Sequence, residues 1–234
     1  MGELVTNWSA PQRPAAYAEQ SLVTAILNGT YPPGSTLPGE RDLAVQLGVT
    51  RPTLRETLQR MECEGWLTIH QGKPTRVRDF WRHGGLGVLS AMVRYGQQLP
   101  PDFVPNLLEV RLAMAPAYTR SAVERSPKMV VAHLANHAEL HDIPEAFASF
   151  DWTLHHTLTI ASGNPVHTLI LNGFAGFYEQ MACLYFARPQ ARAASRAFYA
   201  GLLTAAHGGD AAKAEQITRS MMEESIALWH QANE

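Results

Sequence analysis

The sequence predicts a mainly α-helical protein with a small N-terminal domain of helices and one β-hairpin, followed by an all-α helical bundle. Residues 15–80 alternate short helical patterns with turn signals, whereas the chain after Gly87 has almost continuous helical apolar spacing. Between them, Gly84 and Gly85 fall where an uninterrupted helix would be disfavoured. We therefore expect one domain over 10–80, a linker over 81–87 and a second domain over 88–234.

Length and composition limit the class of protein. The 234 residues are 46% hydrophobic, and no run approaches the roughly 18 consecutive apolar residues that a membrane-spanning helix needs. The first residues lack the apolar core of a signal peptide, and Cys63 and Cys183 are too far apart in sequence for a paired-thiolate metal motif. These features favour a soluble, cytoplasmic protein with no membrane partner and no disulfide framework.

The first 65 residues predict three helices in the order of a helix-turn-helix. An apolar stripe over 16–26 ends in a turn rich in Gly and Pro, and a second helix over 40–46 is closed by Gly48. Thr50 can cap the third helix through its hydroxyl, and Pro52 lies in its first turn, where a missing N–H is harmless.

After Gly65 the apolar spacing changes from a helical period to alternation. Residues 66–69 and 75–78 alternate as strands, and the glycine-containing turn between them predicts a β-hairpin. A hairpin directly after a helix-turn-helix is the wing of a winged helix. The N-terminal domain is therefore expected to be a winged helix-turn-helix.

The net charge of −2 hides an uneven distribution of basic side chains. Five of them gather at the start of the third helix and on the wing: Arg51, Arg55, Lys73, Arg76 and Arg78. A winged helix presents these positions to a DNA duplex, where arginine can donate two hydrogen bonds to a guanine edge. Solvated surface arginines are the alternative interpretation.

The segment over 37–77, LPGERDLAVQLGVTRPTLRETLQRMECEGWLTIHQGKPTRV, resembles the DNA-binding segment of the GntR family and, within it, the fatty acid metabolism regulators known as FadR. The resemblance implies contacts with operator DNA from nine residues: Arg41, Thr50, Arg51, Thr53, Arg55, His70, Gln71, Gly72 and Lys73. It also implies that the wing tip enters the minor groove. The wing departs from the usual FadR order of Gln before His, because His70 precedes Gln71 here.

From residue 86 onward, breaks at Gly and Pro separate about six or seven predicted helices. All-α domains of this size commonly hold a ligand between facing helices. Two stripes of side chains favour such a pocket. One repeats every four residues and contains Ile217, Met221, Ser225 and Trp229. The other is the pair Tyr178 and Tyr185, which are seven residues apart on one helix face. The same stripes also suit a core without a ligand.

The resemblance to FadR continues through the second domain, over 106–111, 161–165, 169–173, 185–187 and 229–230. It implies a site for long-chain acyl-CoA lined or shaped by nine residues: Arg111, His155, Phe174, Tyr178, Tyr185, Tyr199, Met222, Ser225 and Trp229. Two of them depart from the family. Met222 replaces the usual glycine beside the thioester, and His155 replaces an apolar aromatic residue.

Asp151 and His155, four residues apart on a predicted helix, could instead bind a divalent metal. The wider GntR regulators are expected to bind a metal through this pair and two further histidines. The positions that align with those histidines here are Tyr199 and Met221, a poor ligand set for zinc or manganese. We therefore expect no bound metal and no cofactor.

A second possible metal site is the row of His133, His137 and His141, spaced as i, i+4 and i+8. No carboxylate pattern completes this site, so a polar surface helix is the simpler interpretation.

Enzymatic activity has little support in the sequence. Ser162 lacks the strand and tight elbow of a hydrolase nucleophile, and no glycine-rich phosphate loop is present. We expect that the protein is not an enzyme.

These features together predict a homodimeric transcription regulator. The resemblance implies a palindromic operator bound by two winged helices, repression of fatty acid degradation genes, and release from DNA by long-chain acyl-CoA. Activation of unsaturated fatty acid synthesis is a further implication. Two alternatives remain open: a regulator of the same architecture that senses a metal-bound small organic acid through Asp151 and His155, and a metal-dependent hydrolase.

Overall fold

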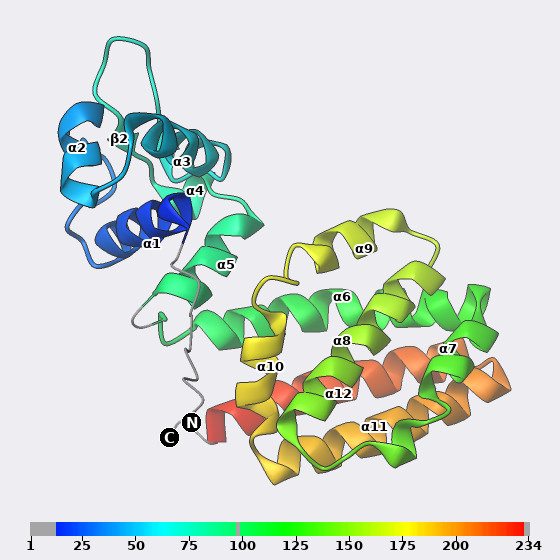
Figure 1. Ribbon diagram of the computed structural model, residues 1–234. Helices are drawn as coiled ribbons and strands as arrows, with labels where there is room; N and C mark the ends of the chain where they lie inside the picture. The colour runs from blue at the N-terminus through cyan, green and yellow to red at the C-terminus, as the bar shows by residue number, and fades with distance from the viewer. Residues whose placement is uncertain (1–12, 97–98, 232–234) are drawn as a thin grey trace, which may run out of the picture. The chain divides into compact units, whose positions relative to one another are not determined.

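The computed structural model describes residues 13–96 and 99–231, which fall into two compact units, Met1–Leu99 and Pro100–Glu234. The described chain is mainly α-helical with a single two-stranded antiparallel sheet, which confirms the predicted fold class (Figure 1). None of the described helices is both long and apolar enough to cross a membrane.

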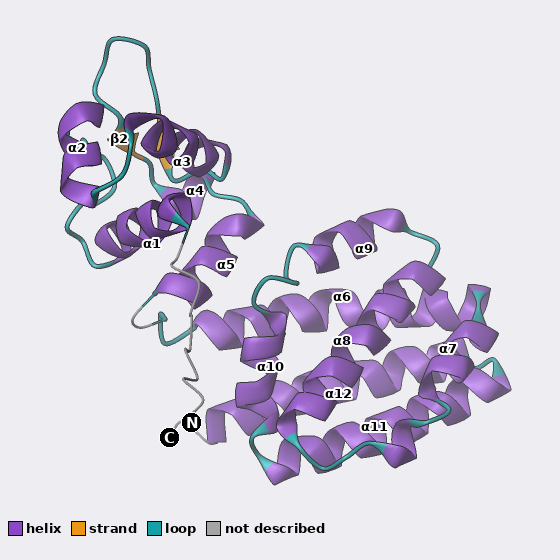
Figure 2. Ribbon diagram, viewed as in Figure 1, coloured by secondary structure: helices purple, strands orange, loops and turns teal. Residues whose placement is uncertain are grey.

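The first unit contains the predicted helix-turn-helix and wing. Its elements are α1 (Pro14–Leu27), α2 (Glu40–Leu47), α3 (Arg51–Cys63), β1 (Leu67–Thr68) and β2 (Arg76–Val77). Figure 2 shows the two short strands joined by a long loop. The strands pair Leu67 with Val77 and Thr68 with Arg76, so the hairpin is shorter than the expected 66–69 and 75–78.

Local signals decide where α2 ends and α3 begins. Gly48 follows α2 in the left-handed conformation with φ of 65°, which glycine adopts at little cost. Two residues later, the Thr50 hydroxyl accepts a hydrogen bond of 3.3 Å from the Thr53 backbone N–H. Both features were expected from the sequence, and together they set the sharp turn between the two helices.

The core of this unit orients α3. Leu54, Leu58 and Met61 are buried on one face of α3, which packs against α1, while Arg51 and Arg55 remain on the exposed face. The helical period thus separates the apolar side of α3 from the side that carries the arginines.

The boundary between the units differs from the expected linker over 81–87. This segment contains most of α4 (Phe80–His83) and the start of α5 (Leu86–Tyr95), and both helices belong to the first unit. The Phe80 ring lies 5.0 Å from that of Trp66, and α5 packs against α1. A Cβ at Gly84 would lie 2.5 Å from the Phe80 carbonyl oxygen, so this glycine serves close packing.

The described part of the second unit contains seven α-helices and one 3-10 turn. They are α6 (Phe103–Arg125), α7 (Pro127–Leu134), η1 (His137–Glu139), α8 (Pro144–Ala161), α9 (Pro165–Asn172), α10 (Tyr178–Phe186), α11 (Pro189–Gly208) and α12 (Ala211–Gln231). With α5, eight α-helices therefore follow residue 85 in the described chain, against the six or seven expected. Proline begins four of these helices, where its missing N–H leaves no hydrogen bond unmade.

Helices α6 and α12 pack along each other, α8 packs on α6 and α10, and α11 packs on α12 (Figure 1). Large side chains fill the space between them, including Phe147, Leu154, Phe186, Tyr199 and Leu202, all 1% exposed or less. This core holds α6, α8 and α10 in fixed register, and these three helices carry most of the polar groups of the pocket described below.

Candidate DNA-binding surface and ligand pocket

The nine residues expected to contact DNA lie on the surface of the first unit. Eight are exposed and Thr53 is partly buried. They lie on α2, at the N-cap and start of α3, and in the long loop between β1 and β2, where Gly72 has a φ of 73°. The fold therefore leaves all nine accessible, with the helix positions and the wing loop on one small domain.

The three arginines of this set have different surroundings. Arg55 Nε donates a hydrogen bond of 2.6 Å to Glu40 Oε2 on α2. Arg41 Nε lies 3.4 Å from Asp42 Oδ1, in a pair that is mostly exposed. The side chain of Arg51 has no hydrogen bond or ion pair with any residue in the described parts of the chain, so its guanidinium is open to a partner.

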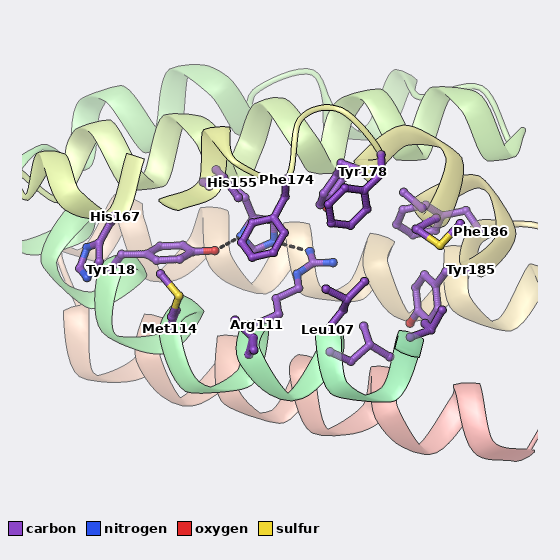
Figure 3. A pocket seen from close by; sticks show the side chains of 17 residues that line it. Leu107, Arg111, Met114, Tyr118, His155, His167, Phe174, Tyr178, Tyr185 and Phe186 are labelled. Carbon is purple, nitrogen blue, oxygen red and sulfur yellow. Dashed lines mark hydrogen bonds between the residues drawn. The ribbon is translucent and has the colours of Figure 1, made fainter. Parts of the chain in front are cut away.

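A largely apolar pocket lies in the second unit between α6, α9 and α10, with His155 of α8 at its wall (Figure 3). Helix α6 supplies side chains at helical spacing, including Val104, Leu108, Arg111 and Tyr118. Residues spaced by three, four and seven share one face of a helix, which explains why a single stripe of α6 lines the cavity.

The remaining wall comes from segments that are distant in sequence. His167 and Leu171 come from α9, Phe174 from the turn that follows it, and Tyr178 and Tyr185 from α10. Tyr178 and Tyr185 were expected to share a face, and both line the pocket.

The polar centre of the pocket is a buried network around Arg111. Its Nη2 donates to the Asp151 carboxylate and lies 2.5 Å from His155 Nε2, while the other ring nitrogen, Nδ1, lies 2.6 Å from the Tyr118 hydroxyl. Asp151 also accepts hydrogen bonds from the hydroxyls of Tyr178 and Tyr199, the second over 3.2 Å. The carboxylate therefore has three donors in a site where it is 2% exposed.

These contacts determine the charge of each group. Burial alone would raise the pKa of Asp151, but the Arg111 guanidinium, then His155 and the Tyr178 hydroxyl, hold that pKa well below its usual range. Burial and the neighbouring Arg111 lower the pKa of His155, and burial raises the pKa of Tyr118 and of Tyr178. At neutral pH the network holds one cation, one anion and neutral His and Tyr side chains.

Five of the nine residues expected at the acyl-CoA site line this pocket: Arg111, His155, Phe174, Tyr178 and Tyr185. The other four do not line it. Tyr199 is fully buried and donates to Asp151, and Ser225 accepts a hydrogen bond of 3.2 Å from Tyr185. Met222 is 2% exposed within the core. Trp229 stacks against the Arg188 guanidinium at 4.8 Å.

Sequence reasoning missed Tyr118, which lines the pocket and contacts His155. Tyr118 follows Arg111 by seven residues, the same interval that drew attention to Tyr178 and Tyr185. The signal was therefore present, although spacing within one helix does not show what that face contacts.

Comparison with known proteins identifies the family to which this chain belongs. Residues 14–77 match the model described as "Bacterial regulatory proteins, gntR family", and residues 78–234 match the "FadR C-terminal domain". The chain belongs to the GntR family of bacterial regulatory proteins. Its second part places it in the FadR branch of that family. It is accordingly a DNA-binding transcription regulator.

Curated relatives resemble this FadR-type regulator along most of its length. Proteins named "Fatty acid metabolism regulator protein" from Edwardsiella ictaluri and Cronobacter sakazakii are 42% and 41% identical over 219 residues, which cover 94% of this chain and 92% of each relative. One of the same name from Shewanella halifaxensis is 46% identical over 186 residues, covering 80% of this chain and 78% of the relative.

A solved structure of Lar, described as controlling the expression of the Listeria monocytogenes agr system, shares the fold of this regulator. It has a TM-score of 0.62 and 16% identity, and the match covers 94% of this chain and 98% of that chain. At this identity the likeness concerns the fold alone.

The donor set in this FadR-type regulator does not fit a metal at Asp151 and His155. Arg111 Nη2 contacts both side chains, so a guanidinium takes the position between them, and the described residues contain no group of three or more His, Cys, Asp or Glu side chains placed to hold a metal. The histidine row is not one helix face either, because α7 ends at Leu134 and His137 lies in η1.

Proposed function

We propose that this regulator controls genes of fatty acid metabolism by binding a palindromic operator as a homodimer, and that a long-chain acyl-CoA releases it from DNA. The observation that carries the proposal is the pocket, whose wall is almost entirely apolar except for the network around Arg111. An apolar cavity with a few fixed polar groups suits an acyl chain joined to a polar head. The names of the curated relatives support the same class of genes.

The resemblance to FadR regulators also implies a direction of regulation. Without ligand, the regulator represses genes of fatty acid degradation, and it additionally activates unsaturated fatty acid synthesis. Release by acyl-CoA requires that the ligand bind the DNA-free conformation more tightly than the DNA-bound one, because a ligand of equal affinity for both shifts no equilibrium. The function is that of a cytoplasmic regulator and not of an enzyme.

A mobility shift experiment tests this proposal. Full-length protein is incubated with a palindromic operator duplex, alone and with hexadecanoyl-CoA, free hexadecanoate or CoA. We expect hexadecanoyl-CoA to release the duplex, with CoA inactive and free hexadecanoate much weaker. A complex that persists at saturating hexadecanoyl-CoA, or equal potency of thioester and free acid, would contradict the proposed effector. Sedimentation of the protein and its complex tests the homodimer.

The competing effector is a metal-bound small organic acid. Elemental analysis of purified protein separates the two, because that alternative needs about one equivalent of a divalent metal per chain. The ion pair of Arg111 with Asp151 is the structural observation that disfavours it.

A further inference from the structure

The pocket contains hydrogen-bond donors that have no protein acceptor. Both contacts made by the Arg111 guanidinium use Nη2, and neither Nε nor Nη1 has a hydrogen-bond partner among the described residues. The side chain of Arg111 is 20% exposed, and these two nitrogens are not among the fully enclosed polar atoms that lack a partner. Figure 3 shows the guanidinium pointing into the cavity.

A second open donor follows from the proton positions on His155. Arginine nitrogens only donate, so His155 Nε2, 2.5 Å from Arg111 Nη2, must accept. A neutral imidazole has one N–H, and it must then lie on Nδ1 and donate to the Tyr118 oxygen at 2.6 Å. The hydroxyl hydrogen of Tyr118 is left without an acceptor among the described residues, on a side chain that lines the pocket.

The charges around these donors favour a neutral acceptor. Asp151 forms an ion pair with Arg111 and so neutralises its charge, although Asp151 itself does not line the pocket. No lining residue is an Asp or Glu. A ligand carboxylate would therefore add a second negative charge to an ion pair that is already balanced in a poorly hydrated site, which costs free energy. A carbonyl oxygen accepts from the same donors without that cost.

We propose that Arg111 and Tyr118 form a donor site that receives a carbonyl oxygen of the effector. The inference rests on the proposed function and specifies which atom of the ligand the pocket recognises. The oxygen has two possible sources, the thioester carbonyl or a ketone on the acyl chain. Apolar side chains such as Leu107, Phe174 and Met181 hold the rest of the chain.

Calorimetric titration of full-length protein distinguishes these sources. The ligands are hexadecanoyl-CoA, S-hexadecyl-CoA, whose thioether lacks the carbonyl, and hexadecanoyl-CoA with a single ketone at successive chain positions. If the thioester carbonyl lies at Arg111, S-hexadecyl-CoA binds about tenfold more weakly or worse than hexadecanoyl-CoA. If a chain ketone lies there, one positional isomer binds about tenfold more tightly than the unsubstituted thioester.

Arg111→Lys is the decisive variant, because lysine can keep the ion pair with Asp151 but lacks the Nε and Nη1 donors. We expect the carbonyl-dependent preference to fall below about threefold in Arg111→Lys and to decrease in Tyr118→Phe. Circular dichroism and thermal unfolding verify that both variants are folded, and the ratio between two ligands on one protein cancels a general loss of affinity.

Equal binding of thioester and thioether by wild-type protein, with no gain from any ketone, would overturn the inference and leave the proposed effector standing. A preference that persists undiminished in both variants would overturn it as well. Absence of binding by both hexadecanoyl-CoA and S-hexadecyl-CoA would refute the proposed effector and the inference together.

Discussion

Arg55 Nε on α3 donates a hydrogen bond of 2.6 Å to Oε2 of Glu40 at the start of α2. The pair is largely exposed, so it contributes at most about 1 kcal/mol to stability. The main effect of the pair is to fix the position of the Arg55 side chain. With Nε held by Glu40, the two terminal nitrogens of Arg55 have no hydrogen-bond partner among the described residues, and they stay available to bond to guanine O6 and N7.

Glu40→Ala is therefore predicted to reduce specific DNA binding by about 1–2 kcal/mol while leaving non-specific binding equal or stronger, because a negative charge near the DNA is lost. Glu40→Gln retains an acceptor for Arg55 and is predicted to preserve most of the specificity. Fluorescence anisotropy with operator and scrambled duplexes at several salt concentrations measures both affinities.

Asp42→Ala is the matched control for Glu40→Ala, because it removes the same charge from a neighbouring exposed pair without freeing Arg55. Asp42→Ala is expected to raise the affinity for the operator duplex and the affinity for the scrambled duplex by the same factor. The orienting role of Glu40 is excluded if the two alanine variants change the ratio of specific to non-specific affinity equally.

Arg51 is predicted to contact a base edge directly, since it is exposed at the first position of α3 and has no partner among the described residues. Arg51→Ala should cost about 1–3 kcal/mol of specific binding and relax base preference at one operator position. Binding to a library of operator variants measures this. Arg82→Ala, on α4, is the control for the loss of one positive surface charge. Unchanged operator affinity in Arg51→Ala would refute the predicted contact of Arg51 with a base.

Met222 is predicted to matter for stability, because it is 2% exposed in the core and does not line the pocket. Met222→Ala should lower the free energy of unfolding by about 2–5 kcal/mol through lost burial and a cavity. Urea unfolding measures the change. Met129→Ala makes the same chemical change at a residue that is 40% exposed, and a similar loss in both variants would argue against this account.

Asp151→Asn is predicted to lower the free energy of unfolding at pH 7 by about 3–5 kcal/mol, because Arg111 is left as a buried charge without its counterion. Since the pKa of Asp151 is depressed in the folded protein, its contribution is complete above the unfolded pKa of about 4 and is lost as the pH falls further. The difference between wild-type protein and variant should therefore shrink below about pH 4.

Urea unfolding at pH 7, 5 and 3.5 measures this dependence. The pKa of His155 is also depressed, so stability in both proteins should begin to fall as the pH drops below about 6.5, the ordinary value for histidine. A difference between the two proteins that stays constant from pH 7 to 3.5 would show that the Asp151 charge does not stabilise the fold.

Much of the first unit could be predicted because its signals are local. The positive φ of Gly48, the Thr50 cap and the apolar face of Leu54, Leu58 and Met61 each depend on residues within a few positions of one another. Gly84 shows the limit of such local signals. A glycine looks alike in sequence whether it gives freedom to a linker or, as here, lets Val88 and the Phe80 carbonyl approach closely.

The pocket was only partly predictable. Spacing placed Tyr178 and Tyr185 on one face of α10, and the family resemblance indicated Arg111 as a pocket residue. Neither indicated that Met222 would lie in the core and away from the cavity. Periodicity gives the direction of a side chain from its own helix and not the identity of the neighbouring helix.

The helical class, the winged helix-turn-helix with its arginines, and the family could all be predicted from residue order, because they depend on short-range patterns and on residue identity. The contact of Arg111 on α6 with Asp151 and His155 on α8, and of His155 with Tyr118, could be seen only in the folded chain. That arrangement depends on how distant helices pack around a shared core, and packing depends on the combined shapes of many side chains and not on any one segment.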